Sequence, residues 1–196
     1  MSFFRTNFAK SPKWLLITIG LGIIAMVSTS AIAYAKILPF TIKNASNNAQ
    51  TIPNTVIIDK VFVDKSERSL QLLSDDKVIK SYRIALGDSP VGHKQQQGDE
   101  RTPVGTYTLD YKNEKSKFYR SIHISYPNAA DKAQAKALGV SPGGDIMIHG
   151  QKNGFSGLAL VNQQRDWTDG CIAVTNDEMN EIMAAVKLGI PIEIVE

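Results

Sequence analysis

Residues 167–176 read WTDGCIAVTN, and this stretch carries the chain's single cysteine, Cys171, between a polar turn and a short apolar run. The run Cys171–Val174 predicts a buried β-strand. Thr175 and Glu178, three residues apart, form a capping box, so a helix is expected to follow and to end near Lys187. The thiol therefore lies at the start of a strand and next to Gly170, where the main chain can approach a substrate closely.

A second apolar run, Asp145–His149, predicts another buried strand, and it ends in His149-Gly150. Only a few per cent of a free thiol is thiolate at neutral pH, but an imidazole can assist by taking the proton. The main-chain N–H groups of Gly170 and Cys171 could form an oxyanion hole. These residues indicate a cysteine acyl-transfer site. The alternative is that Cys171 is a small buried hydrophobe and His149 an ordinary strand-end residue.

The rest of the chain after Val56 alternates apolar and polar residues over short runs, which predicts a mainly β domain with a few short helices. A surface helix is expected at Ala129–Leu138, with Gly139 as its C-cap. Pro191 near the start of the last strand suggests a position at the sheet edge. The remaining expected strands cover residues 61–63, 70–73, 78–86, 105–110, 122–126 and 190–195.

The first 35 residues differ in composition from everything after them. The run Trp14–Tyr34 has no charged residue and is long enough to cross a bilayer as a helix. Arg5, Lys10 and Lys13 precede it, so we expect an exported body behind either a cleaved signal peptide or a membrane anchor. These three residues account for the whole net charge of +3, and the electrically balanced remainder gives no footprint for nucleic acid. Residues 36–58 are expected to form a linker.

The motif His149-Gly150, followed after a gap by Thr168-Asp169-Gly170-Cys171-Ile172, resembles the signature of the L,D-transpeptidase catalytic domain, the YkuD-like family. Upstream, the stretch Thr102–Tyr107 resembles the family's Thr-Pro-x-Gly-x-Tyr/Phe segment. The resemblance covers residues 59–195 and implies a YkuD-like β-sandwich-type domain. Residues 167–176 are similar to a bacterial subgroup with a distinct cysteine motif.

The resemblance also implies an activity and roles for residues at matching positions. Cys171 would be the nucleophile, His149 the general base and acid, and Gly170 with Cys171 the main-chain oxyanion hole. The thiolate would attack a peptidoglycan tetrapeptide stem, expel the terminal D-Ala and pass the acyl group to an amine. Thiol, imidazole and main chain suffice for this chemistry, so no metal or organic cofactor is expected.

Several expectations stay open at the level of sequence. Trp167, Thr168, Asp169 and Arg101 are candidate substrate-binding residues. Asp169 replaces a histidine that many family members carry, and Ala173 replaces an arginine or asparagine. These departures leave three alternatives beside transpeptidation, namely an L,D-carboxypeptidase, an endopeptidase and a non-catalytic wall-binding module. We expect the bacterial cell envelope as the location, either periplasmic or at the outer face of the inner membrane. His93 is expected to be a solvated loop residue, and His123 to lie on a strand's polar face.

Overall fold

The computed structural model describes residues 52–53 and 55–196. The predicted leader, residues 1–35, and most of the predicted linker, residues 36–58, lie outside the described residues. Among the residues that are described, no helix is both long and apolar enough to cross a membrane. The predicted catalytic domain, residues 59–195, is described throughout.

Three antiparallel strands open the domain, namely β1 (Lys60–Asp64), β2 (Ser69–Ser74) and β3 (Lys77–Arg83). Buried side chains alternate with more exposed ones along β1 and the start of β2, because successive side chains of a strand point to opposite faces. The β1–β2 turn is closed by Asp64, whose carboxylate accepts a hydrogen bond from the main-chain N–H of Glu67 at 2.9 Å. The strands expected at residues 61–63 and 70–73 are confirmed, and the one expected at residues 78–86 ends at Arg83.

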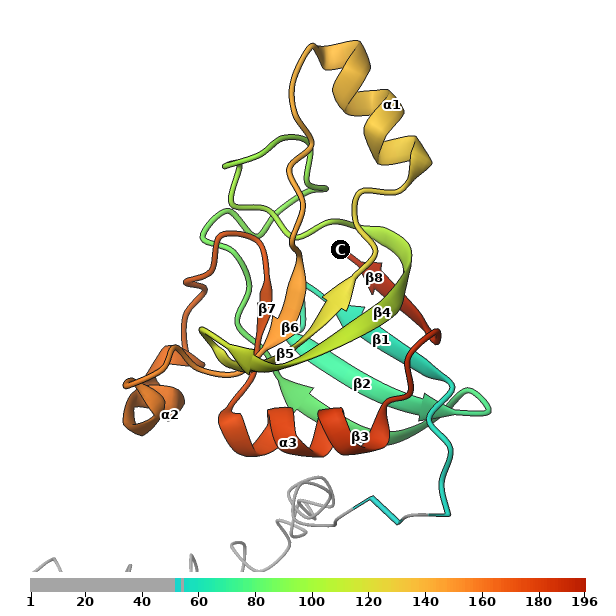
Figure 1. Cartoon of the computed structure of the whole chain (residues 1–196), viewed down its shortest axis with the longest axis vertical. Helices are drawn as coiled ribbons and strands as arrows, with labels where there is room; N and C mark the ends of the chain where they lie inside the picture. The colour runs from blue at the N-terminus through green and yellow to red at the C-terminus, as the bar shows by residue number, and fades with distance from the viewer. Residues whose placement is uncertain (1–51, 54) are drawn as a thin grey trace, which may run out of the picture. The chain divides into compact units, whose positions relative to one another are not determined.

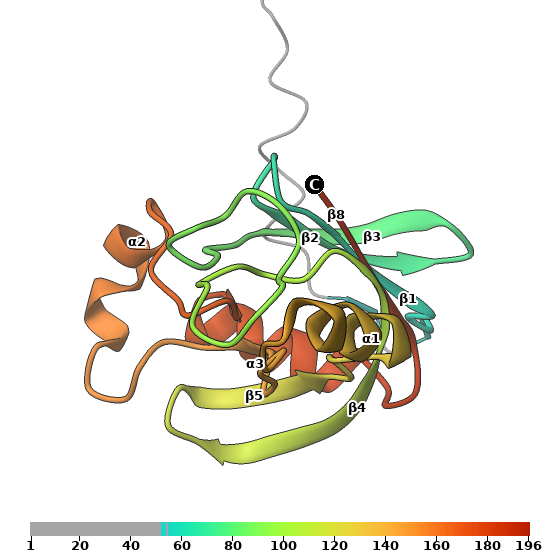
Figure 2. The same cartoon turned by 90° about the horizontal axis from the view of Figure 1, so that it is seen from above.

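Eight strands form one mixed sheet in the order β3-β2-β1-β8-β4-β5-β6-β7 (Figure 1). The β4 strand pairs with β8 over its first residues and with β5 over the rest, so it joins the two halves of the sheet. In Figure 2, the strands β1–β3 and the β4–β5 hairpin are seen on different sides of the domain. The remaining strands are β4 (Gly105–Ser116), β5 (Tyr119–Ile124), β6 (Met147–His149), β7 (Ile172–Ala173) and β8 (Pro191–Val195).

The predicted edge position of β8 is wrong. This strand lies inside the sheet, parallel to β1 on one side and antiparallel to β4 on the other. Pro191 is tolerated because it is the first residue of the strand, where its missing N–H removes only one terminal bond from the ladder. Ile192 and Ile194 are both fully buried, as expected for an interior strand.

Two α-helices follow the expected capping rules. In α1 (Ala129–Leu138), the Asn128 side chain caps the N-terminus and Gly139 ends the helix in a left-handed conformation. In α3 (Asn176–Ala185), Thr175 and Glu178 form the predicted capping box. Figure 1 shows α1 and α3 at opposite ends of the sheet. Two short elements that the sequence did not indicate lie between β6 and β7, a 3₁₀ turn η1 (Ser156–Leu158) and α2 (Ala159–Asn162).

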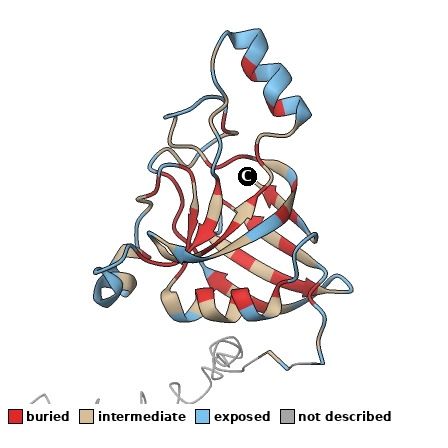
Figure 3. Ribbon diagram, viewed as in Figure 1, coloured by how far each residue is buried: buried red, intermediate tan, exposed pale blue. Residues whose placement is uncertain are grey.

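A single apolar cluster joins both halves of the sheet to α3 (Figure 3). Leu70 and Leu72 come from the first half, Ile122 and Ile148 from the second, and Met179 from the helix. All five side chains are fully buried. This cluster fixes β6 and β7 side by side, which sets the positions of His149 and Cys171.

Candidate active site

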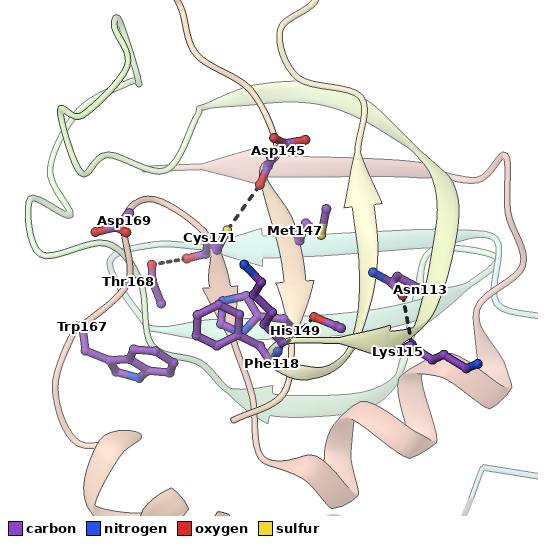
Figure 4. A pocket seen from close by; sticks show the side chains of 12 residues that line it. Asn113, Lys115, Phe118, Asp145, Met147, His149, Trp167, Thr168, Asp169 and Cys171 are labelled. Carbon is purple, nitrogen blue, oxygen red and sulfur yellow. Dashed lines mark hydrogen bonds between the residues drawn. The ribbon is translucent and has the colours of Figure 1, made fainter. Parts of the chain in front are cut away.

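The predicted nucleophile and base lie on neighbouring strands. The β6 and β7 strands are parallel, with Ile148 opposite Ile172 and His149 opposite Ala173. Cys171 is the residue immediately before β7, and His149 is the last residue of β6. Both side chains line the same cavity (Figure 4), although they are 22 positions apart in the sequence.

His149 is buried beneath two aromatic rings. Its side chain has 3% exposure, and its ring centroid lies 4.6 Å from that of Phe118 and 5.7 Å from that of Trp167. Burial lowers the pKa of His149 to about 4, only partly opposed by a hydrogen bond to the main chain. That bond joins Nδ1 to the carbonyl oxygen of Gly150 at 2.7 Å. The neutral imidazole must donate from Nδ1, because a carbonyl can only accept, so Nε2 keeps its lone pair as a base.

Cys171 is a protonated thiol in this resting arrangement. Burial raises the pKa of the thiol, and the carboxylates of Asp169 and Asp145 add to the rise. The main-chain N–H of Met147 opposes it by hydrogen bonding to the sulfur. The thiol itself donates to the main-chain oxygen of Asp145 at 3.6 Å, a contact drawn in Figure 4. The thiol and imidazole are therefore a neutral pair at neutral pH rather than a thiolate–imidazolium pair.

In the turn that carries Cys171, the main chain of Gly170 lies directly against the main chain of neighbouring segments. Gly170 has φ +115°, and a Cβ on it would lie 2.5 Å from the carbonyl oxygen of Arg101. A Cβ on Gly87 would lie 1.9 Å from the carbonyl oxygen of Glu100 and 2.9 Å from the nitrogen of Gly170. No side chain fits at either position, so glycine is required at both.

The side chain of Thr168 stabilises this turn by two hydrogen bonds to its main chain. Its hydroxyl donates to the carbonyl oxygen of Cys171 at 2.7 Å and accepts the N–H of Gly170 at 3.2 Å. The N–H of Gly170, predicted as an oxyanion donor, is therefore already hydrogen-bonded within the turn. The N–H of Cys171 makes no hydrogen bond to any residue in the described part of the chain, which leaves it available as a donor.

Two cavities meet at Cys171. The first has a volume of about 580 Å³ and holds His149. The second has a volume of about 630 Å³ and lies on the other side of the thiol. Cys171, Asp145 and Asp169 belong to both. The other residues of the first cavity are Asn113, Lys115, Ser116, Lys117, Phe118, Met147, Trp167 and Thr168, and those of the second include Lys94, Gln97, Glu100 and Gly143. A side chain that borders two cavities can be reached by an extended chain that occupies both.

The predicted substrate-binding residues are placed differently from one another. Trp167 and Asp169 line the first cavity. Thr168 also lines it, but its hydroxyl is engaged with the turn. Arg101 is not among the residues of either cavity, and its guanidinium lies beside Gly92 instead.

The two other histidines have structural partners. His93 is not a solvated loop residue: its Nδ1 accepts the N–H of Val104 at 3.0 Å, and its Nε2 lies 3.2 Å from the buried carboxylate of Asp131. It thereby connects the loop before β4 to α1. His123 lies on the outer face of β5 as predicted, with its Nδ1 2.6 Å from Asp110. Neither lines the cavities at Cys171.

Sequence reasoning missed the β4–β5 turn as part of the site. Phe118 packs on the imidazole, and Lys117 and Ser116 line the cavity. These residues lie far from His149 in the sequence and in a polar stretch without a recognisable motif. Only the pairing of β5 with β6 brings them to the site.

Comparisons with a family model and with a curated protein both point to the L,D-transpeptidase catalytic domain. Residues 58–194 match the sequence model of the YkuD family, the L,D-transpeptidase catalytic domain. The Escherichia coli (strain K12) protein named "Putative L,D-transpeptidase YafK" is 29% identical over 153 residues. That alignment covers 74% of this chain and 59% of the relative, so this chain spans less than two thirds of the curated relative's length.

Solved structures share the fold. The helical cell shape determining protein Pgp2 from Campylobacter jejuni has a TM-score of 0.54 and 26% identity, over 72% of this chain and 49% of Pgp2. Bd1075 from Bdellovibrio bacteriovorus has a TM-score of 0.51 and 22% identity, over 74% of this chain and 50% of its own. The latter likeness concerns the fold alone.

Proposed function

Because this chain belongs to the YkuD family of L,D-transpeptidase catalytic domains, we propose that it is a cysteine L,D-transpeptidase acting on peptidoglycan stem peptides. The observation that carries the proposal is the placement of Cys171 immediately before β7 and of His149 at the end of the adjacent parallel strand β6, both lining one cavity, with the imidazole Nε2 left as a base. A thiol and a base within one cavity are what nucleophilic acyl transfer requires.

Acylation proceeds from the neutral pair. Nε2 of His149 takes the thiol proton as Sγ of Cys171 attacks the carbonyl carbon of the third stem residue, and the C–S bond forms. The N–H of Cys171 is the donor we assign to the developing oxyanion, and the N–H of Gly170 can join it if it turns from the Thr168 hydroxyl. The imidazolium then protonates the nitrogen of the terminal D-Ala, the C–N bond breaks, and free D-Ala leaves.

Transfer repeats these steps in reverse. An acceptor amine enters, His149 takes its proton, and the nitrogen attacks the thioester. The amide forms, the C–S bond breaks, and the proton returns to the sulfur of Cys171. Water in place of the amine would give hydrolysis, which is the L,D-carboxypeptidase reaction.

We further propose the finer features that the family implies. These are a sandwich-type arrangement of the two sheet halves, a place in the subgroup with the WTDGCIAVTN-type motif, and action in the bacterial cell envelope. The location is supported by the basic residues and the uncharged run of residues 14–34, which are typical of an export signal or anchor.

The test is the product spectrum after incubation of the protein with purified disaccharide-tetrapeptide. Release of D-Ala together with a cross-linked dimer is the expected result, and release of D-Ala with tripeptide alone would replace transfer by hydrolysis. Cys171→Ser is the matched control, and it should fold normally and form no product because an unassisted hydroxyl is a far weaker nucleophile. Product formation by Cys171→Ser at a substantial rate would overturn the assignment.

A further inference from the structure

The two cavities at Cys171 are not equivalent, because only one of them contains the base. His149 lines the cavity under Phe118 and Trp167 and is not among the residues of the second cavity. The proton taken from the thiol must be delivered to the leaving nitrogen, and a general acid must be within hydrogen-bond reach of the atom it protonates. If the proposed function holds, the departing D-residue and the amine that replaces it both occupy the cavity of His149.

One wall of that cavity is the β4–β5 turn, which is fixed by Asn153. The Nδ2 of Asn153 donates to the carbonyl oxygen of Ser116 at 3.1 Å, and its Oδ1 accepts the N–H of Tyr119 at 3.0 Å. Its own main-chain N–H donates to the carbonyl oxygen of Lys117 at 3.1 Å. Asn153 follows His149 by four positions, so these bonds tie the turn to the segment that carries the base.

The same turn brings a cation to the cavity. Phe118 lies on the imidazole at 4.6 Å, and the preceding residue, Lys117, lines the cavity. Within residues 55–196, the ammonium of Lys117 has no ion-pair partner. The acidic residues of the cavity, Asp145 and Asp169, lie at its Cys171 side (Figure 4). The hairpin turn that packs on the imidazole thus brings Lys117, and its neighbour Lys115, to the cavity, whereas the carboxylates lie at the thiol.

The departing group has the matching charge. A terminal D-Ala carries a free carboxylate one carbon from the nitrogen that His149 protonates. An amine at a D-amino-acid centre that replaces it carries a carboxylate at the same distance. An ammonium is a strong partner for such a carboxylate, because charge-assisted hydrogen bonds are about twice as strong as neutral ones.

We propose that Lys117, on the turn that Asn153 fixes and whose Phe118 packs on the imidazole, binds the carboxylate of the departing D-residue and of the D-centre amine that replaces it. Lys117 is thus a specificity-determining residue that selects donors with a free terminal carboxylate over amidated ones.

The experiment compares the tetrapeptide with its C-terminal amide as acyl donors. The wild type should prefer the free acid in kcat/KM by about 10- to 100-fold, the range of one charged hydrogen bond. Lys117→Ala should lose this preference by slowing on the acid alone, and Lys117→Arg should retain most of it. Lys152→Ala is the matched control, because Lys152 is an exposed lysine three residues after His149 that lines neither cavity.

A second readout does not depend on turnover. D-alanine should slow alkylation of Cys171 by iodoacetamide in the wild type and in Lys152→Ala, but not in Lys117→Ala, and D-alaninamide should protect none of them. Mass spectrometry reports the result without ambiguity because the chain has one cysteine.

Each outcome decides the assignment. Equal slowing of Lys117→Ala on acid and amide, an equal effect of Lys152→Ala, or protection of Lys117→Ala by D-alanine would overturn the role of Lys117. Absence of protection in the wild type would overturn it as well. Lys117-dependent protection without any acyl transfer would instead keep the binding site and reject the proposed function.

Discussion

At the scale of single residues, the site combines a buried imidazole with a protonated thiol. Many thiol enzymes hold a preformed thiolate beside a cation, which lowers the thiol pKa. Here burial acts on both groups in the direction of the neutral form, lowering the pKa of His149 and raising that of Cys171. The thiol should therefore react slowly with general alkylating reagents and become nucleophilic only as Nε2 takes its proton.

The low pKa of His149 predicts the pH dependence of acylation. The imidazole has a pKa of about 4 here and an ordinary value of 6.5, so it remains a competent base until the pH falls to about 4. We expect the rate of covalent adduct formation with a carbapenem to hold between pH 6.5 and 5 and to fall near pH 4. Stopped-time mass spectrometry of the adduct across pH 4–7 measures this profile. An acid limb centred near pH 6.5 would contradict a buried neutral base.

Thr168 is expected to act on the turn rather than on the substrate. Thr168→Val keeps the shape of this buried side chain but removes the hydroxyl that bonds to Gly170 and Cys171. Loss of two partners in a buried turn should cost about 1–3 kcal/mol of stability. It should also slow acylation by about tenfold through misplacement of the sulfur. Thr168→Ser keeps the hydroxyl and should restore both the melting temperature and the acylation rate; failure of the serine variant to do so would argue for a different role.

At the scale of elements, the β4–β5 hairpin is the part of the site that depends most on tertiary contacts. Asn153 makes two side-chain bonds to its turn. Asn153→Ala should lower the free energy of unfolding by about 1–2 kcal/mol, since each lost bond contributes about 1 kcal/mol. Urea denaturation measures this change. Asn153→Asp keeps the acceptor for Tyr119 and should lose roughly half as much; equal losses in both variants would mean that the amide donor alone matters.

The same hairpin shows why sequence reasoning reached only part of the site. The buried strands β6 and β7 were predictable because their apolar runs have no solvent-facing residues. The second half of β4 was not predictable, because residues 112–116 are all polar and lack the alternation of apolar and polar residues that marks a strand. Cys171 and His149 could be identified from their chemistry. Phe118 and Asn153 belong to the site only because the fold brings them to His149 and to the β4–β5 turn, and no motif in the sequence indicates those contacts.

At the scale of the whole domain, a buried lysine joins its first strand pair to the loop before β4. Lys65 has 1% exposure, and its ammonium donates to the carbonyl oxygen of Gly92 at 2.7 Å and to Glu196 at 2.9 Å. Glu196 also accepts the N–H of Gly92 at 2.8 Å. Lys94, two residues after Gly92, lines the second cavity. The contacts of Lys65 and Glu196 with Gly92 therefore help to fix the loop that forms part of that cavity.

Removing the charge of Glu196 should weaken the domain. Glu196→Gln is expected to cost about 1 kcal/mol, because Lys65 then keeps only a neutral partner for a buried charge, while solvent already screens the half-exposed Glu196 carboxylate. The hydrogen bond from Lys65 lowers the pKa of Glu196 below 4.5, so its stabilisation is present above pH 4.5 and is lost as the pH falls through the lowered value. Urea midpoints at pH 7 and pH 3 should therefore differ less for Glu196→Gln than for the wild type.

A surface pair provides the control for this measurement. Lys60 and Asp76 lie 3.0 Å apart, but the Asp76 side chain has 89% exposure. Asp76→Asn should change stability by less than about 1 kcal/mol. An effect as large as that of Glu196→Gln would show that burial of Lys65 is not the cause.

The close approach of Gly87, Arg101 and Gly170 has a consequence for the order of events during synthesis. The turn that carries Cys171 is shaped by segments that leave the ribosome at very different times, and the last of them contains the cysteine itself. No earlier fragment of the chain can present the thiol to a substrate, and the base is buried only once Phe118 and Trp167 have packed around it. A newly made chain therefore has no thiol paired with a buried base until its fold is complete, so the acyl transfer proposed for this site can begin only after the last segment has folded.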